Sequence, residues 1–167
     1  EDTMIPPRVK ISGLYVNSIL AKTEATLAGF DEAILLTQEG YVSEGTGENI
    51  FMVVNGELVT PAISDNILGG ITRNTIIHLA RNELGIETVE RNVRRSELYM
   101  ADECFLTGTA AHLTPVGKID NHQIGTGEIG PVTRQLQQLY FDVIRGNSPK
   151  YLHLCTPVHA DVAKARP

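Results

Sequence analysis

Hydrophobic residues along the chain recur with two spacings, one typical of helices and the other of strands. Apolar positions three to four residues apart, bounded by capping residues, predict helices over residues 12–28, 72–84, 96–101 and 131–144. Short apolar runs predict strands over residues 33–37, 50–54, 57–60, 87–93, 104–107, 113–119 and 122–124. Because these elements follow no strict strand–helix–strand rhythm, the pattern favours an α/β or α+β domain with a mixed sheet over a doubly wound parallel sheet.

Turn residues add boundaries to this pattern. Asn55-Gly56 is the strongest short hairpin signal, since both turn positions need a positive φ. Asp120-Asn121 predicts a second hairpin, and the glycine-containing stretch from Gly40 to Asn49 is predicted to be rich in turns. The domain is expected to cover residues 1–146, because residues 147–167 contain three prolines and little periodicity and are typical of a C-terminal tail.

Composition and charge disfavour several classes of protein. The 167 residues, 42% hydrophobic and 20% charged, suit one globular domain. A net charge of −6 without any basic run disfavours nucleic-acid binding, and no apolar stretch approaches the length of a membrane span. Cys104 and Cys155 are far apart and the histidines lack metal-ligand spacing. We therefore expect no disulfide framework, no metal site and a cytoplasmic location. The start at Glu-Asp-Thr is interpreted as a cut inside a longer protein.

One glycine motif is interpreted as a turn. Residues Gly125 to Gly130 match G-x-G-x-x-G and precede a predicted helix. A dinucleotide site also needs a buried apolar strand before the motif and an acidic residue about twenty positions later. Here a polar turn and a short strand precede the motif, and the predicted tail follows the helix. Tight turns are the favoured interpretation.

Four other segments each have an ordinary interpretation and a chemical one. Gly69-Gly70-Ile71-Thr72 lies where a loop enters a helix, so it is either a simple capped start or a cradle for a phosphate. The segment 107–111 is a strand-to-loop junction whose amides could also face an anion. The segment 43–49 is either a solvated loop or a source of carboxylates, and Lys10 is a surface charge unless its neighbours give it a function.

The four segments together suit a cofactor that forms a Schiff base. Such an enzyme needs a lysine, an acid beside the pyridine nitrogen, an anion cradle and a donor to the ring hydroxyl. The candidates are Lys10, Glu44, the helix start at Ile71–Thr72 with Thr109, and Tyr15.

The segments around Lys10–Ser18, Gly40–Asn49, Gly69–Arg73 and Thr107–Ala111 resemble, in the same order, those of fold-type IV aminotransferases. The subgroup resembled is the branched-chain amino-acid aminotransferases, over roughly residues 8–146. The resemblance implies the large C-terminal domain of a fold-type IV enzyme, with pyridoxal 5'-phosphate as cofactor.

The resemblance also implies a role for each matching residue. Lys10 is similar to the lysine that holds the cofactor and moves the proton, Tyr15 to the tyrosine at the ring hydroxyl, Glu44 to the glutamate at the pyridine nitrogen, Leu68 to the leucine on the ring face, Ile71, Thr72 and Thr109 to the phosphate contacts, and Thr109 and Ala110 to the amides that face the substrate carboxylate.

The implied reaction transfers an amino group between leucine, isoleucine or valine and 2-oxoglutarate. Family members carry an N-terminal domain before the lysine, so the resemblance implies that this partner domain is missing and that the isolated chain is inactive or nearly so. It also implies a homodimer or larger assembly. Two alternatives stay open: a D-amino-acid aminotransferase or aminodeoxychorismate lyase of the same fold, and a non-catalytic folding or assembly module.

Overall fold

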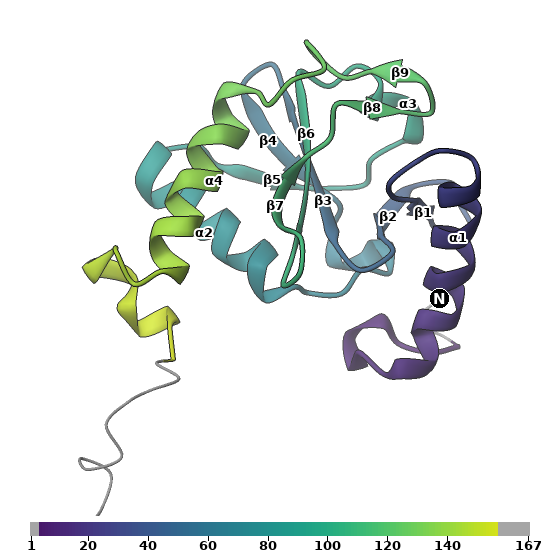
Figure 1. Cartoon of the computed structure of the whole chain (residues 1–167), viewed down its shortest axis with the longest axis horizontal. Helices are drawn as coiled ribbons and strands as arrows, with labels where there is room; N and C mark the ends of the chain where they lie inside the picture. Colours follow the sequence, from purple (N-terminus) through teal and green to yellow (C-terminus); the bar gives the residue numbers. More distant parts are fainter. Residues whose placement is uncertain (1–3, 157–167) are drawn as a thin grey trace, which may run out of the picture.

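The computed structural model describes residues 4–156, which form a central sheet with structure packed on both faces (Figure 1). The sheet has the strand order β5-β4-β3-β6-β7, from β3 (Asn49–Val54), β4 (Glu57–Thr60), β5 (Thr88–Glu90), β6 (Glu103–Gly108) and β7 (His112–Pro115). β4 and β5 are parallel and the other neighbours are antiparallel. The predicted mixed sheet is therefore confirmed.

Two long helices cover one face of this sheet. α2 (Ile71–Leu84) connects the parallel strands β4 and β5, and α4 (Pro131–Ile144) packs beside it (Figure 1). Both bury apolar side chains against the stacked rings of Phe51 and Phe105, whose centroids are 5.0 Å apart. Leu136 of α4 is fully buried, and burying a side chain of this size stabilises the fold by about 2 kcal/mol.

The opposite face carries the smaller elements. The two-stranded sheet of β1 (Ile34–Leu36) and β2 (Val42–Gly45), the short helix α3 (Arg95–Leu98) and the hairpin of β8 (Lys118–Ile119) and β9 (His122–Gln123) lie there. Both predicted hairpin turns are confirmed, because Asn55, Gly56, Asp120 and Asn121 all have positive φ. Gly125 and Gly127 also have positive φ and form turns before α4.

Two predicted segments differ from the structure. The stretch Gly40–Asn49 contains a strand, β2, because Val42 bonds to the distant Val93 and β2 pairs with β1. The strand predicted over residues 113–119 is divided, because Gly117 lies so close to Gly127 that a Cβ would stand 2.4 Å from its carbonyl oxygen. β7 therefore pairs with β6, and β8 pairs only with β9.

The ends of the described chain also show structure that the sequence pattern missed. The predicted helix over 12–28 begins as a 3-10 turn, Ser12–Leu14, and continues as α1 (Tyr15–Leu27). Its apolar residues Val16, Ile19 and Leu20 are exposed rather than packed. Beyond residue 146, η4 (Pro149–Leu154) packs on α4 and its Tyr151 is buried in the core, while residues 157–167 of the predicted tail lie outside the described residues.

No helix within residues 4–156 combines the length and the apolar character needed to cross a membrane.

Candidate active site

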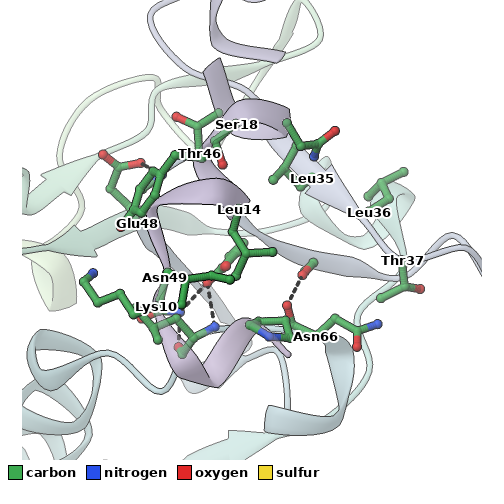
Figure 2. Close-up of a pocket in the computed structure, with 18 residues that line it drawn as sticks. Lys10, Leu14, Ser18, Leu35, Leu36, Thr37, Thr46, Glu48, Asn49 and Asn66 are labelled. Atoms are coloured by element: carbon green, nitrogen blue, oxygen red, sulfur yellow. Dashed lines mark hydrogen bonds between the residues drawn. The ribbon is translucent and has the colours of Figure 1, made fainter. Parts of the chain in front are cut away.

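Four of the proposed site residues line one cavity of about 270 Å³. Lys10 and Tyr15 reach it from the N-terminal segment, Glu44 from β2, and Leu68 from the loop that leads into α2. Leu14, Thr46, Glu48 and Asn49 line it too (Figure 2). The fold thus brings together side chains from segments that are far apart in the sequence.

Lys10 has an unusual backbone at the end of the 3-10 turn Pro7–Val9. Its φ of 48° and ψ of 42° place it in the left-handed region, which costs a residue with a side chain about 1 kcal/mol. Its Nζ lies 6.0 Å from the centre of the Tyr15 ring, and its charge also acts on the Glu44 carboxylate. Both Lys10 and Tyr15 are exposed in the described chain.

Glu44 is the acid of the cavity, and its environment is half-prepared for a cation. Burial raises the pKa of its carboxyl to about 7, against the opposing effects of the Leu68 amide and the Lys10 charge. Oε2 accepts hydrogen bonds from Leu68 N at 2.9 Å and from Asn49 Nδ2 at 3.1 Å. Within residues 4–156, Oε1 has no hydrogen-bond partner, so one oxygen is anchored and the other can accept from a ligand.

The start of α2 is an anion cradle beside this cavity. Its first main-chain helical bond runs from Asn74 N to Gly70 O, so the amides of Ile71 and Thr72 precede the hydrogen-bonded turns. Gly70 at the N-cap makes no side-chain cap, and Thr72 is buried whereas the Ile71 side chain is exposed. Unpaired amides at a helix start favour a phosphate group.

The buried Arg73 anchors this helix start. Its guanidinium donates to Pro61 O at 3.1 Å and forms an ion pair with Glu90 at 2.6 Å, so the entry of α2 is held against the ends of β4 and β5.

Thr109 and Ala110 lie outside the cavity, in the exposed turn between β6 and β7. A Cβ on the preceding Gly108 would stand 3.2 Å from Gly47 O, so this turn lies directly beside the glycine turn of residues 45–47. The eight predicted residues therefore fall into two neighbouring groups, one in the cavity and one in the turns that border it.

Sequence reasoning missed a carboxylate pair at the edge of the cavity. Glu32 bonds to Lys22 at 2.7 Å and accepts from Thr46 Oγ1 at 2.6 Å. Burial raises the pKa of Glu32, but these partners outweigh burial and lower it overall, whereas burial and the nearby Glu32 raise the pKa of Glu48. No sequence spacing signals this pair, because the fold brings β1, β2 and α1 together.

Comparison with known proteins places the chain in a family. The profile of the family described as "Amino-transferase class IV" matches residues 4–119. The chain belongs to the class IV aminotransferases, which confirms the resemblance inferred from its sequence.

Within this family the chain is homologous to branched-chain amino-acid aminotransferases that depend on pyridoxal phosphate. A probable branched-chain-amino-acid aminotransferase of Aquifex aeolicus is 57% identical over 95% of this chain and 51% of its own length. The chain thus spans about half the length of the curated relatives it matches.

Solved branched-chain aminotransferases have the same fold. The enzyme from Thermobaculum terrenum, crystallised in its PLP form, is 48% identical with a TM-score of 0.88, over 90% of this chain and 49% of its own. A second enzyme, whose source is abbreviated T.th., is 46% identical with a TM-score of 0.88, over 91% of this chain. The match covers 51% of that enzyme in its complex with N-(5'-phosphopyridoxyl)-L-glutamate and 50% in its complex with 4-methylvaleric acid.

Proposed function

We propose that the protein transfers an amino group between a branched-chain L-amino acid and 2-oxoglutarate, with pyridoxal 5'-phosphate held by Lys10. The observation that carries this proposal is the meeting of Lys10, Tyr15, Glu44 and Leu68 at one cavity beside the start of α2. The donor set fits the cofactor, because it offers an amine, a partly anchored acid and unpaired helix amides, one for each polar part of that molecule.

The bound cofactor would supply an electron sink for the charge that develops at the substrate Cα. Glu44 Oε1 accepts a hydrogen bond from the ring nitrogen, and the carboxylate keeps that nitrogen protonated. Lys10 Nζ takes the proton from the substrate Cα and returns it during the transfer. The Tyr15 hydroxyl donates toward the ring oxygen, and Leu68 packs against the ring face.

The turns beside the cavity hold the anionic groups in this proposal. The amides of Ile71 and Thr72, with the hydroxyls of Thr72 and Thr109, bind the phosphate. The Thr109 and Ala110 amides bind the substrate carboxylate.

The substrate class rests on relatives. Those that match this chain carry the name branched-chain-amino-acid aminotransferase, and one of them was crystallised with 4-methylvaleric acid, an apolar branched acid. The same relative was also crystallised with a phosphopyridoxyl adduct of L-glutamate, the amino acid that 2-oxoglutarate would become.

The decisive experiment is substrate profiling of the protein at its full encoded length. Amino transfer from L-leucine, L-isoleucine or L-valine to 2-oxoglutarate, lost in Lys10→Ala, supports the proposal. Activity with D-alanine but not L-leucine would instead favour the D-amino-acid aminotransferase of the same fold. Absence of any visible absorption band from bound cofactor would favour a non-catalytic module.

A further inference from the structure

Asn49 has no role in the proposed chemistry, yet it is a buried polar residue at the centre of the candidate site. It is the first residue of β3, only 5% exposed, and it pairs across the sheet with Thr107, two residues before the Thr109 turn. Burial of a carboxamide is costly unless its polar atoms find partners.

The Asn49 amide nitrogen finds two partners that both belong to the site. Nδ2 donates to Glu44 Oε2 at 3.1 Å and to Leu68 O at 2.8 Å, drawn as dashed lines in Figure 2. Leu68 N donates to the same Glu44 oxygen at 2.9 Å. These three bonds join the acid, the carboxamide and the residue on the ring face into one closed network.

The other side of the Asn49 carboxamide lies against the anion cradle. A Cβ added to Gly70, the N-cap of α2, would stand 2.2 Å from Asn49 Oδ1. Only a glycine allows this approach, so the amide of Asn49 sets how closely the α2 start comes to β2 and Glu44.

We propose that Asn49 is a positioning residue: it holds Glu44 by Oε2, turns Oε1 toward a cationic ring nitrogen, and fixes that carboxylate relative to the phosphate cradle of α2. The proposal rests on the proposed role of Glu44 but not on the identity of the amino-acid substrate. It differs from a purely structural role because an amide donor on a carboxylate stabilises the charged form.

The test measures the Glu44 carboxyl itself, by ¹³C NMR titration of the full chain free of cofactor, with the Glu44→Gln spectrum identifying the signal. The charged groups that act on this carboxyl are Lys10 and Glu48, and both stay in place in every variant. In Asn49→Leu, which keeps the side-chain shape and removes the donor, the pKa of Glu44 should rise by about one pH unit.

Thr60→Val is the matched control. It also removes a buried side-chain bond of this sheet, from Thr60 Oγ1 to Ile50 O at 2.7 Å, but Thr60 does not line the cavity. An unchanged Glu44 pKa in Asn49→Leu, or an equal rise in Thr60→Val, would overturn the proposal. Should Asn49→Leu not fold, Asn49→Ser removes the same donor and is judged by the same two outcomes.

The titration also separates this proposal from the proposed function. A shifted Glu44 pKa together with no amino transfer from L-leucine in the full-length protein would support Asn49 as the positioning residue and reject the proposed substrate.

Discussion

Replacing Glu44 by Gln should stabilise the cofactor-free chain at neutral pH while removing the acid of the site. Gln has the same shape and its amide oxygen can still accept from Leu68 N and Asn49 Nδ2. What it removes is the buried negative charge, whose burial raises the pKa of the carboxyl from 4.5 to about 7.

The magnitude follows from this pKa. A raised pKa means that the folded chain keeps a proton that the unfolded chain has released, so the free energy of unfolding falls as pH rises from about 4.5 to about 7 and is level above. Each pKa unit corresponds to about 1.4 kcal/mol, so the ionised carboxylate costs the fold on the order of 3 kcal/mol.

Urea unfolding of the wild-type chain and Glu44→Gln between pH 4 and pH 8 measures this cost. The difference in unfolding free energy should grow in favour of the variant by about 3 kcal/mol across that interval. Glu83→Gln is a control of opposite sign, because hydrogen bonds from Lys150 and Tyr151 lower the pKa of Glu83 and its charge stabilises the fold. A difference for Glu44→Gln that stays constant with pH would refute the reasoning.

Three further outcomes are expected. Gly70→Ala should destabilise the chain by about 1–3 kcal/mol in urea unfolding, since its Cβ would meet Asn49, whereas Gly69→Ala, whose Cβ would meet only Ile63 at 3.7 Å, should change little. Glu103→Ala should cost about 2 kcal/mol in the same assay, because the buried carboxylate accepts from two amides at the start of α4; a loss equal to that of Glu103→Gln would contradict this. Residues 1–167 alone should show little or no amino transfer in an L-leucine assay, because Lys10 and Tyr15 stay exposed to water, and ready turnover would contradict this.

Local signals in the sequence predicted much of the fold. The Asn55-Gly56 turn, the glycine stop of α2 and the proline start of α4 are where the pattern puts them, since each depends on a few neighbouring residues. The pairing of β2 with β1 could not be predicted, because the partners of Val42 lie elsewhere in the chain.

The candidate site shows the same division. Lys10, Tyr15, Glu44 and Leu68 were found through their resemblance to a family, and the structure places them at one cavity. Asn49 was noticed only as the end of a turn-rich segment, because its importance comes from contacts with Leu68 and Gly70, which follow it by about twenty residues. An amide that bridges two segments has no signature in either one.

The most direct test of the central claim is to find the lysine that carries the cofactor. The full-length protein is incubated with pyridoxal 5'-phosphate, reduced with borohydride and digested, and the peptides are mapped by mass. The account predicts the pyridoxyl mass on Lys10, with Lys22, Lys118 and Lys150 unmodified, and no label within this chain in Lys10→Ala. Label on another lysine, or a labelled Lys10→Ala chain, would contradict it.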